Sequence, residues 1–173
     1  MQSRLLVTFC QEKRTMRKTI VPVTAEIPEI RAERRPWLDL EYIAHVELSS
    51  EDPEYPFENA LKDTSLKSWK AATSGVQHIK LSFDKPQAVK RIHLQFLESS
   101  LERSQEIALY AWAEDQPRKE LVRQQWAFSP NGSTSETEDY YFDLRRVRSI
   151  ELRIDPGRHD QTAIATLQSI RIG

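Results

Sequence analysis

The sequence predicts an all-β protein built as an antiparallel β-sandwich. From Trp37 onward, apolar residues recur at every second position, the period at which strand side chains alternate between two faces. These runs are short and end in turn residues, and no amphipathic helix of a dozen residues separates them. Antiparallel strands at this spacing favour two packed sheets, as in a sandwich or jelly roll, over a βαβ fold.

Size and charge limit what the chain can be. Its 173 residues are enough for one domain with a short appendage. The net charge of -1 provides no overall field that would attract nucleic acid or anionic lipid, so any such binding requires a local patch.

The N-terminal segment differs from the rest. Residues 1–36 contain eight Lys or Arg and four Glu, a local balance of +4. Pro22 and Pro28 suit an extended edge strand or a wrapping arm better than a helix. We therefore treat residues 1–36 as an N-terminal extension and 37–173 as the β-sandwich domain. A pair of ordinary strands in the main sheet is an equally weighted alternative for the first segment.

The main domain contains six clear alternating runs, which end in predicted turns such as Asp84-Lys85-Pro86, Pro130-Asn131-Gly132 and Asp155-Pro156-Gly157. A single short helix is predicted over Pro56–Lys62, where Pro56 suits the first turn. The six runs cover residues 79–83, 92–96, 107–111, 140–144, 150–154 and 170–172.

The four tryptophans are interpreted mainly as packing residues. Trp69 is predicted to be a core anchor, because burying an indole removes roughly 150 to 250 Å² from water. Trp37, Trp112 and Trp126 fall in strand-like runs and are expected in the core or in cross-strand pairs. Asn59 is expected to hold the turn near Pro56 through backbone hydrogen bonds.

Several short motifs follow one another in an order that is typical of a known fold. From Ser49 to Gly173 the chain resembles the galactose-binding-like jelly roll, the fold of coagulation factor 5/8 C-type (discoidin) domains and many carbohydrate-binding modules. The motifs are Ser49-Ser50, Asn59-Ala60-Leu61, Trp69, Gly75 with Ile79-Leu81-Phe83, Lys85-Pro86 with Val89 and Ile92, and the last strand at 167–173.

A narrower resemblance lies within that fold. The region is similar to the N-terminal domains of X-ray repair cross-complementing scaffold proteins, which assist single-strand break repair. Ser68 departs from their pattern, which usually has a basic residue there. The matching residues are Ser49, Ser50, Asp52, Glu58, Asn59, Leu61, Lys62, Trp69, Lys70, Ala71 and Ala72.

Sugar recognition would use loops at one end of the sandwich, because it needs a flat aromatic ring beside polar side chains. Tyr55 is the candidate stacking platform, and Arg158, His159 and Asp160 are the candidate polar partners. The alternatives are a packing role for Tyr55 and an ordinary solvated turn at 158–160. The loops considered are 51–57, 97–104, 129–138 and 156–161.

The resemblance also implies a structural calcium site in many relatives, at positions matching Asp63 and Thr64. Here the usual D-G-D turn reads Lys62-Asp63-Thr64, and Gln168 replaces the closing glutamate. Calcium prefers several negatively charged oxygen ligands, so calcium binding is the less favoured alternative.

No catalytic or membrane signal stands out in the sequence. It has no H-E-x-x-H, no G-x-S-x-G and only four glycines for a phosphate loop, so an enzyme is not expected. Cys10 is the only cysteine, and the apolar run Leu5–Cys10 is too short for a signal or membrane segment. We therefore expect a cytoplasmic protein without a membrane anchor.

The leading hypothesis is a non-catalytic module that binds carbohydrate through its loops. The alternative is an intracellular protein-interaction or DNA-repair scaffold domain of the same fold, and a hydrolase accessory domain is a third interpretation. Arg145, Arg146 and Arg148 could contact a phosphate backbone, as could Arg31, Arg34 and Arg35. Nearby acidic residues dilute both clusters, so direct nucleic-acid binding is not expected.

Overall fold

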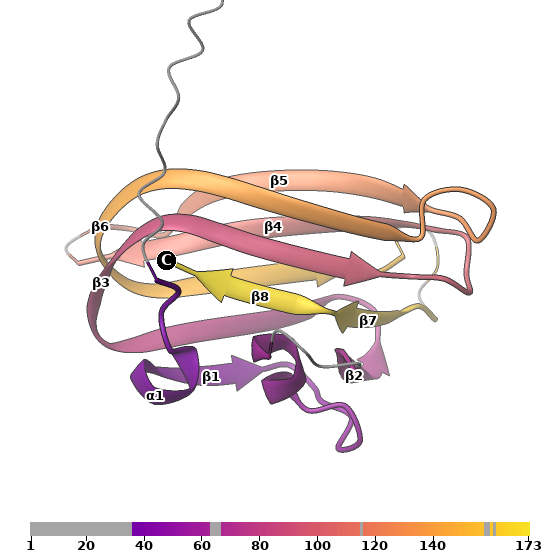
Figure 1. The fold of residues 1–173 in the computed structure, drawn as a ribbon, viewed down its shortest axis with the longest axis horizontal. Coiled ribbons are helices and arrows are strands. Elements are labelled where there is room, and N and C mark those ends of the chain that lie inside the picture. Colours follow the sequence, from indigo (N-terminus) through magenta and orange to yellow (C-terminus); the bar gives the residue numbers. More distant parts are fainter. Residues whose placement is uncertain (1–35, 63–66, 115, 158–159, 161) are drawn as a thin grey trace, which may run out of the picture. The chain divides into compact units, whose positions relative to one another are not determined.

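The structure is a computed structural model that describes residues 36–62, 67–114, 116–157, 160 and 162–173. Strands dominate these ranges, as the sequence predicted (Figure 1). The elements are the helix α1 (Leu40–Ile43), β1 (Ala44–Leu48), the 3-10 helix η1 (Phe57–Leu61), β2 (Trp69–Ser74), β3 (Gln77–Leu97), β4 (Arg103–Ala113), β5 (Lys119–Phe128), β6 (Ser135–Asp155), β7 (Ile164–Leu167) and β8 (Ser169–Ile172).

The strands form two layers in which every pairing is antiparallel. One layer has the order β1, first half of β3, second half of β6, β4, β5, and we call it the five-stranded layer. The other consists of β8, the second half of β3 and the first half of β6, and we call it the second layer. β2 and β7 form a separate two-stranded sheet. The predicted antiparallel sandwich is confirmed.

β3 and β6 differ from the prediction, because each combines two predicted strands into one strand of 21 residues. The predicted turn at Asp84-Lys85-Pro86 lies within β3, where the pairing with β6 shifts register between Ser82 and Gln87. Irregularities of this kind let a strand bend without ending. At the bend of β6, Arg146 has a φ of 54°. Both strands pass from one layer to the other through these bends (Figure 1).

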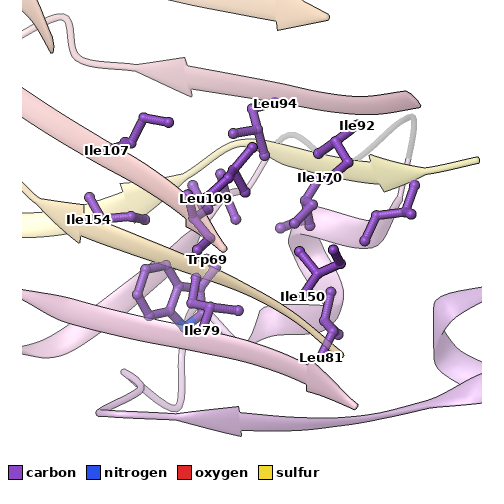
Figure 2. Packing of buried hydrophobic residues seen from close by; sticks show 14 of the residues in the cluster. Trp69, Ile79, Leu81, Ile92, Leu94, Ile107, Leu109, Ile150, Ile154 and Ile170 are labelled. Carbon is purple, nitrogen blue, oxygen red and sulfur yellow. The ribbon is translucent and has the colours of Figure 1, made fainter. Parts of the chain in front are cut away.

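The core lies between the layers and contains the inward-facing residues of the alternating runs (Figure 2). Trp69 is fully buried there, which confirms its prediction as a core anchor. Trp126 is also buried, and its ring centroid lies 5.3 Å from that of Phe96. An aromatic-to-alanine change at such a site typically costs about 3 to 5 kcal/mol of stability.

The predicted short helix is present as η1. Pro56 precedes it in an extended conformation, and the Phe57 N–H donates to Glu51 Oε2 over 2.8 Å. Asn59 Nδ2 donates to the Ser68 carbonyl over 3.3 Å, which is the turn-fixing role expected of this side chain. These contacts hold the 51–61 segment against the start of β2.

The N-terminal boundary remains a prediction, because residues 1–35 lie outside the described residues. The Leu38 N–H donates to the Ile172 carbonyl over 2.7 Å, so the first described residues run beside the last strand. Across the described ranges, no helix has the length and apolar character needed to cross a membrane.

Candidate functional site

The outer face of the five-stranded layer carries a dense set of charged and aromatic side chains. The pairing of the strands brings these side chains together. Glu151 on β6 lies between Lys80 on β3 and Tyr110 on β4, and Tyr110 in turn lies opposite Glu120 on β5. We call this surface the charged sheet face. It comprises Glu47, His78, Lys80, Glu106, Ala108, Tyr110, Trp112, Arg118, Glu120, Arg123, Gln125, Glu151 and Arg153.

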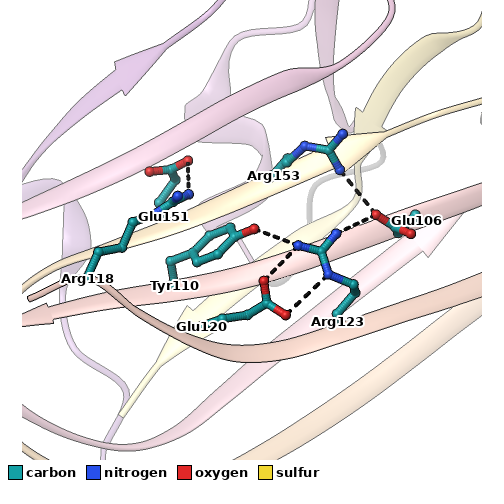
Figure 3. A network of polar contacts seen from close by, with 7 residues as sticks. All are labelled: Glu106, Tyr110, Arg118, Glu120, Arg123, Glu151 and Arg153. Carbon is teal, nitrogen blue, oxygen red and sulfur yellow. Dashed lines mark hydrogen bonds and ion pairs between the residues drawn. The ribbon is translucent and has the colours of Figure 1, made fainter.

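Arg123 is the centre of one half of the charged sheet face (Figure 3). Its Nη1 lies 2.6 Å from Glu106 Oε1, and its Nη2 donates to Glu120 over 2.7 Å and to the Tyr110 hydroxyl over 2.8 Å. Arg153 Nη1 reaches the same Glu106 oxygen at 3.3 Å. The hydrogen bond from Arg123 lowers the pKa of Glu120, so this carboxylate stays ionised at neutral pH.

Glu151 organises the other half. It accepts a hydrogen bond from Arg118 Nη2 over 3.2 Å, and its Oε1 lies 2.8 Å from His78 Nδ1. The Arg118 guanidinium lies 3.5 Å from the centre of the Tyr110 ring and 5.4 Å from that of Trp112. Tyr110 is therefore only 7% exposed although it points away from the core.

Two cations lie over the Trp112 ring, Lys80 from β3 and Arg118 from the segment just before β5. Lys80 Nζ lies 5.6 Å from its ring centre, and Lys80 also pairs with Glu47 over 3.3 Å. The sequence predicted Trp112 as a packing residue, and it does pack across strands, but on the outer face. Such cation–π contacts typically contribute about 0.5 to 1 kcal/mol at exposed sites.

The charged sheet face can act as a recognition surface for a large partner. Its arginines are held in place by carboxylates, yet the Arg118 and Arg123 side chains are still 44% and 43% exposed. Arg, Tyr and Trp are enriched at protein interfaces relative to the rest of the protein surface. A regular sheet face with charges of both signs suits a complementary protein surface better than a small molecule, which needs a concave site.

The predicted sugar-site residues are placed apart as far as the structure describes them. The Tyr55 carbonyl accepts from the Lys70 N–H near the start of β2, and its ring has Lys67 at 5.5 Å and Lys70 at 5.4 Å. Asp160 lies near the other end of β2, where the Gly75 N–H donates to the Ala163 carbonyl. Arg158 and His159 lie outside the described residues, so the complete site stays a prediction.

Asp160 itself fixes a local turn. Its Oδ1 accepts from the Thr162 hydroxyl over 2.6 Å and from the Thr162 N–H over 2.8 Å. These hydrogen bonds lower the pKa of the Asp160 carboxyl. This is a structural role.

The predicted calcium ligands Asp63 and Thr64 also lie outside the described residues. Within the ranges that are described, no three His, Cys, Asp or Glu side chains gather closely enough to hold a metal ion. The absence of a cofactor, with calcium as the less favoured alternative, therefore stays a prediction.

Sequence reasoning missed a buried arginine at the loop end. Arg103 Nε lies 3.0 Å from Glu98 Oε2, and its Nη1 donates to the carbonyls of Pro156 and Ile164. Burial lowers the pKa of Arg103, and the nearby Glu98 opposes that shift. A signal was present: Arg103 has the same strand parity as the core residues Ile107 and Leu109.

Solved structures with this architecture define the class of fold as the galactose-binding-like jelly roll of carbohydrate-binding modules. The family 32 module of AlyQ, solved with 4,5-unsaturated mannuronic acid, is 17% identical, with 80% of this chain and 98% of that chain covered and a TM-score of 0.58. A family 32 module from Clostridium perfringens, solved with GalNAc-β-1,3-galactose, is 13% identical over 79% and 99%, with a TM-score of 0.57. At these identities, the likeness shows the fold alone.

The family is shown by the sequence. The family model described as the XRCC1 N terminal domain matches residues 38–165, and the chain belongs to that family. Both resemblances expected from the motifs are therefore confirmed. No curated protein matches the chain.

Proposed function

We propose that this chain is a non-catalytic interaction module that binds a partner protein through the charged sheet face. The observation that carries the proposal is the pair of half-exposed arginines on a regular sheet face: Arg118 lies over the Tyr110 and Trp112 rings, and Arg123 donates to the Tyr110 hydroxyl. The chain belongs to the XRCC1 N terminal domain family, and its motifs resemble those of repair scaffold proteins. Both findings support the same function. This function is the alternative that the sequence predicted, a protein-interaction domain of the same fold.

The physical basis is preorganisation. Binding orders long side chains, at a cost of about 0.5 to 1.5 kcal/mol for each immobilised one. Arg118 and Arg123 already have fixed orientations, because Glu151, Glu120 and Glu106 accept their hydrogen bonds. A partner carboxylate can therefore pair with them at a reduced entropic cost.

The test compares two arginines in matching environments on opposite layers. Arg118 lies over Tyr110 and Trp112 on the charged sheet face, whereas Arg91 lies over Trp37 at 4.7 Å and Tyr141 at 5.5 Å in the second layer. The full chain is used to capture partner proteins from a cell extract. Arg118→Glu is expected to reduce the specific capture at least about tenfold, and Arg91→Glu to leave it unchanged. The proposal is contradicted if Arg118→Glu and Arg91→Glu capture equal amounts of the partner, or if the wild type captures no specific protein.

Carbohydrate binding is the second candidate, supported by the sugar ligands of the solved neighbours. Calorimetric titration of the full chain with GalNAc-β-1,3-galactose and with unsaturated mannuronic acid tests it. Saturable binding that is lost in both Tyr55→Ala and Arg158→Ala would establish the predicted loop site. No heat with any sugar contradicts this candidate. Repeating the titration with and without calcium, in wild type and Asp63→Asn, tests the metal prediction.

A further inference from the structure

One edge of the second layer is open. Residues 135–144 of β6, which we call the β6 edge, pair with β3 on one side, as in Ile92 opposite Tyr140. β4 joins β6 only from Val147 onward, so in the part of the chain that the structure describes the β6 edge has a single strand neighbour. A strand edge of this length presents backbone N–H and C=O groups with which another strand can pair.

The core-side residues of the β6 edge change character along the strand. Glu136 and Glu138 lie opposite the core residues Phe96 and Leu94 of β3, and directly paired residues point to the same face of a sheet. Both carboxylates therefore point towards the inside of the sandwich, at its open side. The core-side residues that follow are half-buried and aromatic or aliphatic, namely Tyr140, Phe142 and Leu144.

β5 borders this open side from the opposite layer. The Tyr140 hydroxyl donates to Gln124 Oε1 over 2.7 Å, which joins the two layers. Towards the bend of β6, the two strands border a cavity of about 280 Å³ whose lining includes Leu121 and Leu144. The open side therefore combines a backbone edge with an apolar recess.

The carboxylates on the outer side of the β6 edge already have cations. Asp139 Oδ1 lies 2.8 Å from Arg91 Nη2 and 3.0 Å from His93 Nδ1. Asp143 pairs with Lys90. Because these carboxylates are paired within the molecule, they offer little to an incoming strand.

Glu136 and Glu138 differ, because their hydrogen-bond donors are neutral. Glu136 accepts from the Ser133 hydroxyl over 2.9 Å and Glu138 from Gln124 Nε2 over 2.8 Å, and neither forms an ion pair within the part of the chain that the structure describes. Charges that point inward at a sheet edge deter strands whose facing residues are apolar or acidic. A strand with cations at these two positions avoids that penalty, because it pairs the carboxylates that it covers.

We propose that the β6 edge binds an extended segment of a partner protein in which alternate apolar residues are followed by two basic residues. In antiparallel pairing, the apolar residues of the segment face Leu144, Phe142 and Tyr140, and its two cations then face Glu138 and Glu136. Backbone hydrogen bonds supply affinity, and the alternate side chains supply specificity. The charged sheet face belongs to the other layer, so the two sites can be occupied independently.

Two synthetic peptides with blocked ends test this binding site on the full chain by fluorescence anisotropy. The basic peptide TVTVTVTKTK follows the proposed register, and the acidic peptide TVTVTVTETE reverses its charges. The wild type is expected to bind the basic peptide at micromolar concentrations and the acidic one at least about tenfold more weakly. Bound basic peptide should protect residues 135–144 from hydrogen exchange.

Variants of the chain provide the reciprocal test. E136K/E138K is expected to prefer the acidic peptide, and this gain of binding also shows that the variant is folded. The control E41K/E54K makes the same charge change at two exposed glutamates outside the β6 edge, and it should keep the preference of the wild type.

Three outcomes overturn the proposal. The first is no binding of the basic peptide up to about 1 mM, and the second is equal affinity of the wild type for both peptides. The third is protection of another strand in place of residues 135–144. Arg118→Glu is expected to abolish partner capture and leave the affinity for the basic peptide unchanged, so failure here is distinguishable from failure of the proposed function.

Discussion

Two groups of arginine–glutamate pairs in this protein have the same chemistry and different surroundings. Arg103 and Glu98 at the loop end are only 5% and 13% exposed, whereas Arg118 and Arg123 of the charged sheet face are almost half exposed. The buried pair joins the β3–β4 loop to the segments around Pro156 and Ile164. Burial therefore makes one group a structural clamp, while the exposed group can exchange its partners for those of another molecule.

The largest effect is expected at the buried pair. Arg103→Ala leaves Glu98 without its cation and two carbonyls without a donor, and breaking a buried pair in this way costs about 3 to 5 kcal/mol of unfolding free energy. Urea unfolding measures the loss. The double variant Arg103→Met/Glu98→Gln is expected to lose less, because no unpaired buried charge remains. A loss below about 1 kcal/mol for Arg103→Ala would show that the clamp is unimportant.

The next largest difference is expected in salt dependence, which should be strong for the exposed arginines of the charged sheet face and weak for the buried Arg103–Glu98 pair. Exposed charges are screened at distances beyond about 8 to 10 Å near physiological ionic strength, and buried pairs much less so. Capture of the partner should therefore fall several-fold when salt is raised, while the stability difference between wild type and Arg103→Ala stays the same. Capture that is insensitive to salt would contradict an electrostatic role for the charged sheet face.

A smaller effect is expected on the stability of the charged sheet face itself. Arg118→Ala removes one ion pair and the contacts with Tyr110 and Trp112, which together contribute about 0.5 to 1 kcal/mol at exposed positions. Urea unfolding at low salt measures this, with Arg91→Ala as the matched control. A loss as large as that of Arg103→Ala would make Arg118 a structural residue.

The smallest effect is expected on the loss of stability in acid, to which Glu120 contributes. The folded-state pKa of Glu120 is lowered by its hydrogen bond with Arg123. Its contribution to stability is thus complete above the unfolded-state value of about 4.3, and is lost as the pH falls through the lower folded-state value. Glu120→Gln should lose this small contribution at neutral pH and should show a weaker acid dependence than the wild type. An unchanged acid transition in the variant would exclude the Arg123 contact as its cause.

The sequence predicted the strands better than their pairing. The alternation in residues 107–111 placed Leu109 inside and Tyr110 outside, because that pattern is local. The two bends were missed, since Asp84-Lys85-Pro86 was interpreted as a turn and the runs 140–144 and 150–154 as separate strands, while each strand continues through an irregular register. Arg118 and Glu151 meet only because β4, β5 and β6 pair in one register, and a contact between residues 33 positions apart leaves no local signal.

The candidate site shows the same limit. Tyr55 was correctly expected in a loop. The cations near its ring are Lys67 and Lys70, which are more than ten positions away in the sequence and were not expected there. Trp112 was expected to pack, yet its neighbours are Lys80 on β3 and Arg118 just before β5, and the order of these strands in the sheet could not be read from the chain. Residue type and parity were therefore predictable, whereas the face assembled from five strands was not.

The most direct test of the central claim places a photo-crosslinking amino acid at Gln125, on the charged sheet face, or at Tyr55, at the loop end. Gln125 is exposed and lies opposite Glu106 in the pairing of β4 with β5. If the charged sheet face is the recognition surface, the partner protein crosslinks from position 125 and not from position 55. Crosslinking from position 55 alone would contradict the claim and move recognition to the loops.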